Sequence, residues 1–390
     1  MIKLFPLENL EISGTKVNTY AMIQVDDEIE IIIEPTLFLS YLSLEYGSQE
    51  TVRGYGRDLL KFFRELKGVY SSNGTLGQDF REVSNDQMNA YINAYLRQKE
   101  GLKLATINRH ISSLKAFYDY IYTNGWMSER KDYSFSLRKD AIKTSELEGI
   151  ATKLTQEYMD ETEFKKLLDS VPTTNHFKNK RDRLALMLGY YVGFRSGELV
   201  NPYNLRVDYI EDLIVVDDHK VPRIEKPMRI LGKGNKERKA RVSAEIVQPL
   251  YEFLRIAKKL GATHLMCKLD GSPLKDRKFG TDLFRDTADL TLLSGNLSPE
   301  EAEQWIMRHF HCGRKCYATN SVTYCYHPNI QLDHRTHVTN WMGHSHPKTT
   351  EIYIYFEALL HQRHKILKEM DFSKMLGSFH QNVVLDDIDN

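Results

Sequence analysis

The feature of this sequence that most constrains its fold is a change in hydrophobic period near Pro35. Before it, apolar residues run through Thr19–Val25 and Ile29–Ile33, on either side of the Asp26-Asp27 turn, which predicts short strands. After it, four successive stretches repeat apolar residues at helical spacing. The sequence therefore predicts a β segment at residues 1–34, to which it assigns no function, followed by a four-helix bundle at residues 35–126.

Capping residues mark the limits of the predicted helices. Ser48 and Ser84 suit the N-caps of the second and third helices, and Asn124-Gly125 ends the fourth, which starts near Ala105. The apolar side chains expected to face the interior are, helix by helix, Leu37, Phe38, Tyr41 and Leu44; Val52, Tyr55, Leu59, Phe62, Phe63 and Leu66; Met88, Tyr91, Ile92 and Leu96; and Ile107, Ile111, Leu114, Phe117, Tyr118 and Ile121.

Beyond the bundle the pattern predicts a second domain of mixed structure. Residues 127–153 have no clear period and are expected to be a linker, and the second domain is expected at residues 154–360, with Thr155 as its first N-cap. Helical patterns dominate it, with strand-like segments at residues 213–216 and 228–231 and a hairpin turn at Gly232–Asn235. Residues 361–390 form a tail. The expected fold class is mainly α with a small β-sheet or hairpin.

Charge is distributed unevenly along a chain that is neutral as a whole. The 53 Lys and Arg residues balance 53 Asp and Glu residues, yet residues 219–241 hold nine basic side chains against only Glu225 and Glu237. Such a block can attract phosphates, although a solvated lysine-rich hairpin would have the same composition. The chain has no run of about 20 apolar residues, and its Met1-Ile2-Lys3 start lacks a secretory core, so a cytosolic protein without membrane contact is expected.

Five short patches follow one another along the second domain and combine arginine, lysine, histidine and tyrosine. They are Gly193–Leu199, Gly232–Arg238, His311–Arg314, Gly343–Ser345 and Thr349–Tyr353. A phosphodiester resists nucleophiles because its free oxygens are negative. Fixed arginine donors and a tyrosine nucleophile therefore suit its cleavage.

This ordered set resembles the catalytic motifs of the tyrosine recombinases, the phage integrase family. Ala105–Arg109 and Leu114–Phe117 also resemble that family's helical core-binding domain, and the resemblance extends over about residues 36–360. It implies a SAM-like DNA-binding domain followed by a mixed α+β catalytic domain. The implied function is site-specific recombination of duplex DNA through a 3′-phosphotyrosyl intermediate, by a homotetramer on two paired sites, in DNA integration, transposition or resolution.

The resemblance implies no cofactor. Positioned arginines replace a metal, and the phosphotyrosyl bond conserves the energy of the broken bond, so neither metal nor ATP is required. Accessory DNA-bending or directionality proteins, and packing of the tail at residues 361–390 on a neighbouring protomer, are further expectations by analogy.

The resemblance assigns the phosphate-binding roles to numbered residues. Arg195 and Arg314 would hold the phosphate oxygens, and Glu198, three positions after Arg195, would orient a site residue. His311 and His344 would hydrogen-bond the phosphate and exchange protons with the attacking phenol.

The nucleophile and the general acid each have a neighbouring rival. Tyr353 lies nine positions after His344, as the family pattern requires, and Tyr355 is its rival. Lys233 at the tip of the predicted hairpin would protonate the leaving 5′-oxygen, with Lys236 as the competing candidate.

Basic residues on the predicted outer faces are candidates for DNA contacts, although such faces are usually only solvated. The candidates are Arg53, Arg57, Arg109, Lys115, Lys236 and Arg238.

Three departures separate this chain from the common family pattern. Lys315 stands where a second histidine is usual, an apparent insertion occupies Tyr326–Arg335, and Met342 replaces the leucine before Gly343. None of them removes a catalytic group.

Three other functions would share parts of this pattern. A catalytically silent DNA-binding regulator on the same fold would lack Arg195, Arg314 or Tyr353, and a type IB topoisomerase would share the chemistry but relax supercoils as a monomer. A zinc protein would use the cysteines and histidines around Cys312, but their spacing matches no common zinc template, so no metal ligand is expected. The residues concerned are Cys312, Cys316, Cys325, His309, His311 and His327.

Overall fold

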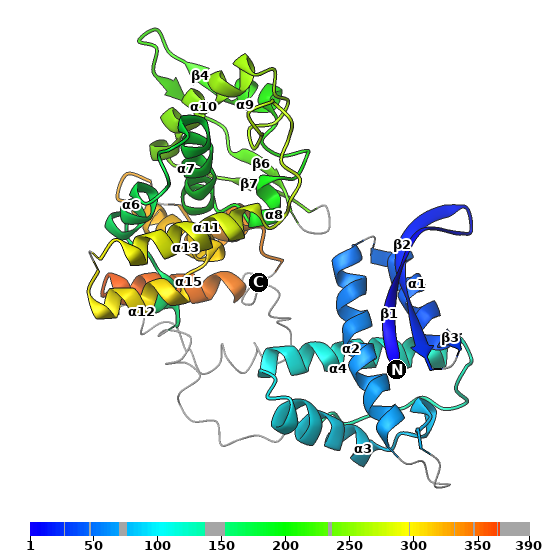
Figure 1. Ribbon diagram of the computed structural model, residues 1–390. Helices are drawn as coiled ribbons and strands as arrows, with labels where there is room; N and C mark the ends of the chain where they lie inside the picture. The colour runs from blue at the N-terminus through cyan, green and yellow to red at the C-terminus, as the bar shows by residue number, and fades with distance from the viewer. Residues whose placement is uncertain are drawn as a thin grey trace. The chain divides into compact units, whose positions relative to one another are not determined.

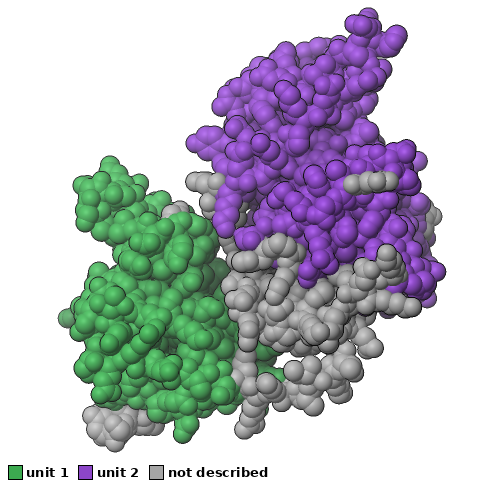
Figure 2. Space-filling view, turned by 180° about the vertical axis from the view of Figure 1, so that it is seen from behind, with its two compact units in different colours: residues 1–142 green, residues 143–390 purple. Residues whose placement is uncertain are grey.

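The chain divides into two units, residues 1–142 and 143–390 (Figure 2). The computed structural model describes residues 1–26, 28–46, 48–69, 76–136, 153–232, 236–295, 297–330, 332–345, 348–364 and 366. Most of the predicted linker, the hairpin tip with Lys233 and the tail from residue 367 lie outside these described residues.

The first unit is a three-stranded sheet followed by helices (Figure 1). Its elements are β1 (Ile2–Ile12), β2 (Thr15–Val25), β3 (Ile29–Ile31), α1 (Ile33–Tyr46), α2 (Gln49–Gly68), a short 3-10 helix (Phe80–Glu82), α3 (Asn85–Ala90), the π-helix η2 (Tyr91–Lys99) and α4 (Leu104–Thr123).

The sheet at the N-terminus packs on α1 and α2 and shares their core. Its strands are antiparallel in the order β1-β2-β3. Met22 is fully buried with Phe38, and β1 approaches α2 closely, since a Cβ on Gly56 would lie 3.0 Å from the Leu4 side chain. The expectation of a β segment at residues 1–34 is confirmed, and β2 and β3 cover the two strands named in it. The separate strand β1 was not delimited, because its apolar residues do not alternate regularly.

The capping predictions for this unit are confirmed. The Ser48 hydroxyl accepts from the Thr51 backbone N–H, and Ser84 forms a full capping box with Gln87. α4 ends as expected, with Asn124 as its C-cap. Hydroxyl side chains satisfy the unpaired N–H groups of a first helical turn, which is why these positions could be predicted locally.

The predicted inner face of α1 is wrong in part. Phe38, Leu39 and Leu42 are buried, whereas Leu37, Tyr41 and Leu44 are each more than 40% exposed. The helix is apolar on nearly all sides, so its sequence does not select a face, and packing against β2 and α2 made the choice.

The second unit is built mainly of helices around small two-stranded sheets (Figure 1). Residues 153–157 are helical. The elements that follow are α6 (Glu161–Asp169), α7 (His176–Tyr191), α8 (Ser196–Leu199), α9 (Val207–Leu213), β4 (Val215–Val216), β5 (Pro222–Arg223), β6 (Met228–Leu231), β7 (Glu237–Ala240), a 3-10 helix (Ala244–Ile246), α10 (Val247–Lys259), α11 (Phe279–Leu293), α12 (Pro299–Met307), α13 (Phe310–Cys325), α14 (His334–Met342) and α15 (Lys348–Leu360).

The hairpin predicted in the basic block is confirmed, while two boundary predictions are wrong. β6 and β7 pair antiparallel, from Met228↔Ala240 to Leu231↔Glu237. Thr155 lies inside a helical turn rather than at its start, and Asp160 is instead an N-cap, that of α6. Only Val215 and Val216 of the segment 213–216 form a strand, since α9 extends to Leu213.

A separate apolar cluster holds α13, α14 and α15 of the second unit together. α13 packs against α7, α14 and α15, and Tyr353 of α15 lies in this cluster with Val322, Trp341 and Phe356. The fold therefore brings the last two sequence patches, 343–345 and 349–353, onto the helix that carries His311 and Arg314. Among the described residues no helix is long and apolar enough to cross a bilayer.

Candidate active site

The turn between α7 and α8 carries the first predicted catalytic arginine. Gly193 has a φ of +72°, and a Cβ there would lie 2.4 Å from the ring of Tyr317, so the turn requires glycine. Phe194 is fully buried, and Arg195 follows as the N-cap of α8 with a partly exposed side chain. An anchored aromatic next to a partly exposed arginine holds the guanidinium at a fixed place on the surface.

Glu198 is the buried carboxylate that organises this turn. It accepts from the Arg195 backbone N–H at 2.9 Å and from Arg195 Nη1 at 2.9 Å, and Arg238 Nη2 donates to it at 2.9 Å. Burial raises the pKa of this carboxyl, but Arg238, Arg314 and Arg195 outweigh burial and lower the pKa to about 2. Glu198 is therefore ionised at neutral pH and orients Arg195, the role expected from the sequence.

Two buried arginines join the Arg195 turn to the end of α14. Arg314 Nη1 and Arg238 Nη2 both donate to the Gly193 carbonyl at 2.7 Å. Arg314 Nη2 also donates to the Met342 carbonyl, and Arg238 Nη1 donates to the Trp341 carbonyl at 2.8 Å. The planar guanidinium can serve acceptors on two segments at once, so this pair sets the spacing between the two segments.

Arg238, predicted to contact DNA, is buried in this structure, and its contact with DNA stays a prediction. Its side chain is only 3% exposed and is surrounded by protein acceptors. Its place between exposed residues of a basic strand suggested a surface role, but the strand alternates, and position 238 faces inward while Lys239 faces out. Arg314 is 1% exposed, so it too lies beneath the surface in this structure.

His344 and Tyr353 lie side by side at the other edge of the site. Gly343 ends α14 with a φ of +67°, and the ring of His344 stacks on that of Tyr353 with centroids 6.0 Å apart. His344 Nδ1 lies 2.9 Å from Thr350 Oγ1, which in turn lies 2.8 Å from Thr339 Oγ1. The two threonines were not predicted; they orient the imidazole through Nδ1.

His311 occupies the first turn of α13, half-buried. Burial lowers its pKa, and Arg314, Lys315 and Arg195 lower it further, to about 3. The imidazole is therefore neutral at physiological pH.

The unusual Lys315 has a structural partner. Its Nζ lies 2.6 Å from Glu157 Oε2, and both side chains are about 95% buried. This ion pair connects α13 to the helical residues 153–157, which the motif alone did not indicate.

Of the two general-acid candidates, the structure describes only Lys236. Lys233 lies outside the described residues, but Gly232 beside it is close to the site: a Cβ there would lie 3.0 Å from Glu198 Oε1. Lys236, the rival, is exposed, and its Nζ donates to Ser345 Oγ at 3.4 Å. Both ends of the hairpin tip thus lie next to predicted site residues. Tyr355, the rival nucleophile, is half-buried two positions beyond Tyr353.

The remaining predicted DNA contacts lie on the surface of the first unit. Arg53, Arg57 and Lys115 are exposed. Arg109 is 55% exposed but also donates to the buried Asp58 at 2.7 Å, so part of its charge is compensated inside the helical unit. Their contact with DNA stays a prediction.

Alanine at Gly193 is expected to destabilise the second unit strongly. The positive φ costs about 1 kcal/mol for a residue with a Cβ, and the 2.4 Å approach to buried Tyr317 adds about 1–3 kcal/mol. Gly261→Ala is the matched control, because Gly261 has a φ of +65° with no atom within 4 Å. Urea unfolding would measure both; equal losses in the two variants would contradict a steric role for Gly193.

Acid should weaken the fold through His311. The pKa of His311 is lowered from 6.5 to about 3 in the folded protein, so below pH 6.5 the unfolded chain binds a proton at His311 that the folded protein does not bind. The stability that the neutral His311 contributes is therefore complete above pH 6.5 and is lost as pH falls toward 3. At pH 5.5 the loss is about 1.4 kcal/mol. Unfolding free energies of wild type and His311→Gln, measured between pH 7.5 and pH 5.5, should converge by roughly this amount; a constant difference would show that His311 titrates normally.

The fold and the site together define a helical unit followed by a unit in which Arg238 and Arg314 join the Arg195 turn to the end of α14, where His344 lies beside Tyr353. The model of the phage integrase N-terminal SAM-like domain matches residues 36–125, and that of the phage integrase family matches residues 157–358. The chain belongs to the phage integrase family, the tyrosine recombinases.

Curated relatives agree with this membership, and solved structures share the fold. The tyrosine recombinase XerC of Staphylococcus carnosus is 26% identical over 328 residues, covering 82% of this chain and 90% of the relative. The TnP I resolvase of Bacillus thuringiensis is 25% identical over 320 residues, covering 81% and 93%. The XerH recombinase in a post-cleavage complex with difH DNA is similar in fold, with a TM-score of 0.54, 18% identity and coverage of 82% and 80%. The Tn1549 transposon integrase with circular intermediate DNA gives a TM-score of 0.51, 15% identity and coverage of 82% and 94%.

Proposed function

We propose that this protein is a site-specific recombinase that cuts and rejoins duplex DNA through a 3′-phosphotyrosyl intermediate. The observation that carries the proposal is the paired bridge of Arg314 and Arg238, which ties the Arg195 turn to the end of α14. Directly beyond that end, His344 stacks on Tyr353. A structural role alone would not require a tyrosine beside a histidine oriented by two threonines.

The proposed reaction is a direct displacement at phosphorus. Tyr353 Oη bonds to the phosphorus, the bond to the 5′-oxygen breaks, and a lysine of the 232–238 hairpin protonates that oxygen as it leaves. The phosphate stays a diester, so the reverse attack by a 5′-hydroxyl needs no added energy. Arg195 offers its guanidinium from the surface, while His311 and His344 exchange protons with the phenol.

DNA binding is proposed to rearrange this site. Tyr353 is 6% exposed, and Arg314 now donates to two backbone carbonyls. Arg314 uses one N–H of each Nη on these carbonyls, so a phosphate would meet its remaining donors once DNA binding exposes the guanidinium. A dianionic transition state is a strong acceptor for them.

Recognition of duplex DNA is proposed for the first unit. Arg53 and Arg57 line, with Lys3 and Arg64, a cavity of about 530 Å³ between the N-terminal sheet and α2. A concave cluster of four cations suits backbone phosphates. The named relatives act in recombination and resolution, and two of the similar structures hold DNA, which supports the same substrate class here.

A tetramer is proposed because recombination between two duplexes breaks four DNA strands. Each chain offers one Tyr353, and exchange between two duplexes breaks four strands, so four protomers would supply one nucleophile per strand. Accessory DNA-bending or directionality proteins are compatible with this assembly.

The proposal is tested with nicked duplexes drawn from the DNA that flanks the gene, incubated with protein and EDTA. The nick lets the short 5′-hydroxyl fragment diffuse away, so the covalent intermediate accumulates and runs as a shifted band on a denaturing gel. Such a band would support metal-independent tyrosine chemistry. Specific binding without a band would favour a silent regulator, and relaxation of supercoils without strand exchange between two sites would favour a topoisomerase.

A further inference from the structure

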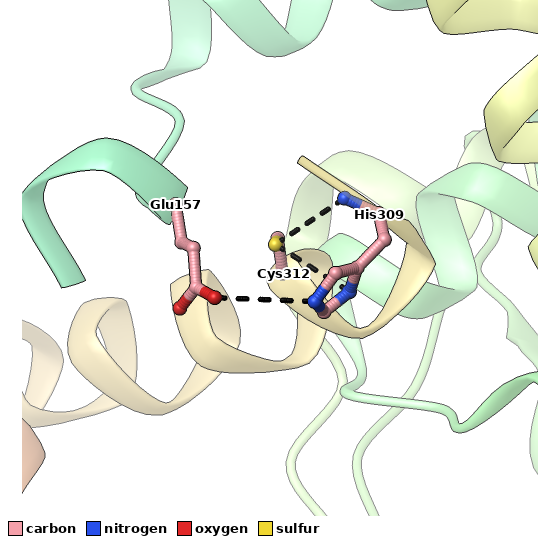
Figure 3. Close-up of side chains that lie close together, drawn as sticks. All are labelled: Glu157, His309 and Cys312. Atoms are coloured by element: carbon pink, nitrogen blue, oxygen red, sulfur yellow. Dashed lines mark hydrogen bonds and ion pairs between the residues drawn. The ribbon is translucent and has the colours of Figure 1, made fainter. Parts of the chain in front are cut away.

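Three metal-binding side chains meet at the start of α13, outside the proposed catalytic machinery. Glu157 comes from the helical residues 153–157, His309 is the N-cap of α13, and Cys312 lies in its first turn. One ligand atom from each lies within 4.8 Å of the others (Figure 3). Thiolate, imidazole and carboxylate are the donor types that bind zinc in proteins.

The thiol lies on the Nδ1 side of the His309 imidazole. Cys312 Sγ lies 3.6 Å from His309 Nδ1. Zinc bonds of about 2.3 Å to sulfur and 2.0–2.1 Å to nitrogen, at a tetrahedral angle, place these two atoms about 3.6 Å apart. Figure 3 shows the sulfur beside the His309 ring, whose other nitrogen faces Glu157.

The carboxylate divides its two oxygens between different partners. Glu157 Oε2 lies 2.6 Å from Lys315 Nζ, while Oε1 faces His309, 3.9 Å from Nε2. Lys315 can therefore keep its ion pair and orient the carboxylate from behind, as an outer partner commonly does for a metal ligand. Lys153 lies 4.0 Å from Oε1, but this side chain is 41% exposed and can turn toward solvent.

A turn of the His309 ring separates this arrangement from a metal site. Cys312 Sγ lies near Nδ1 whereas Glu157 Oε1 faces Nε2, and one ion binds only one of the two ring nitrogens. The His309 side chain is 41% exposed, so its ring can turn to place one nitrogen between the thiol and the carboxylate. Exposure at His309 also gives water access to a fourth coordination position. The cluster found among the described residues includes neither Cys316 nor Cys325, so it differs from the cysteine set considered in the sequence.

We propose that Glu157, His309 and Cys312 bind one zinc-class divalent metal ion, which links residues 153–157 to the start of α13. The ion would clip together two segments about 150 residues apart in the chain. It takes no part in strand cleavage; it stabilises the base of the helix that carries His311, whose ring centroid lies 6.3 Å from that of His309.

Cobalt(II) titration of the full-length, metal-stripped protein tests this site without DNA. One equivalent of Co²⁺ should give tetrahedral d–d bands and a thiolate-to-cobalt charge-transfer band, and Zn²⁺ should displace it. Glu157→Gln and His309→Gln should weaken binding by at least about tenfold, and Cys312→Ser should abolish the charge-transfer band. Cys267→Ala, which removes a buried thiol elsewhere in the unit, should leave the bands unchanged.

Thermal unfolding provides a second test of metal binding that does not depend on the cobalt absorption bands. Zn²⁺ should raise the Tm of wild type and of Cys267→Ala by several degrees but not that of His309→Gln, whose exposed side chain can be replaced without leaving a cavity. The absence of a stoichiometric charge-transfer band, its persistence in Cys312→Ser, or equal Tm shifts in wild type and His309→Gln would each overturn the proposal. None of these outcomes bears on whether the protein cleaves DNA.

Discussion

Replacing Tyr353 with phenylalanine is expected to abolish covalent attachment to DNA while leaving the fold intact. The substitution removes only the attacking oxygen, and the ring keeps its place beside His344 and in the apolar cluster with Phe356. Loss of a nucleophile lowers the cleavage rate by more than about a thousandfold. Unfolding stability should change by only about 1 kcal/mol, the usual net contribution of one hydroxyl hydrogen bond.

Tyr355→Phe is the matched control, because Tyr355 lies on the same helix, two positions away and half-buried. Two residues along a helix turn a side chain by about 200°, so both tyrosines cannot face one phosphate. The nicked-duplex assay should show the covalent band for wild type and Tyr355→Phe, and no band for Tyr353→Phe. A band that disappears only with Tyr355→Phe would transfer the nucleophile to Tyr355.

Arg238→Met is expected to destabilise the second unit by about 3–5 kcal/mol, the usual cost of breaking a buried ion pair by removing one partner. The variant leaves the Trp341 carbonyl without its guanidinium donor and removes one of the cations that hold Glu198 ionised. The link between the Arg195 turn and α14 would then depend on Arg314 alone, so cleavage should fall by more than about a hundredfold even where the variant is folded.

Lys239→Met separates this structural role from loss of charge, because Lys239 is the next residue on β7 and is exposed. It should change the unfolding free energy by less than about 0.5 kcal/mol. Urea unfolding and the salt dependence of DNA binding would be measured for both variants. A stable Arg238→Met protein with weaker, less salt-dependent DNA binding would instead support the predicted phosphate contact of Arg238.

Much of the fold could be predicted because its signals are local. The Ser48 and Ser84 caps, the end of α4 at Asn124 and the β6–β7 hairpin each depend on residues within a few positions of one another. Where local signals were ambiguous the predictions failed. α1 is apolar on most sides, so only its neighbours could choose the buried face. The Thr155 cap was wrong because the helical residues 153–157 already include it, and the capping box of Asp160 with Glu163 begins the next helix, α6.

The sequence by itself determined the order of the reactive groups, the family to which they belong and the helices that carry them, because these depend on residue type and short spacing. Only the tertiary structure decided how those groups are held. Arg238 and Trp341 are 103 positions apart, and Lys315 and Glu157 are 158 apart, yet each pair is a buried contact. Whether an arginine side chain is exposed to solvent or bonded to a carbonyl depends on which distant segments pack against it. The spacing of side chains along one strand does not specify those segments.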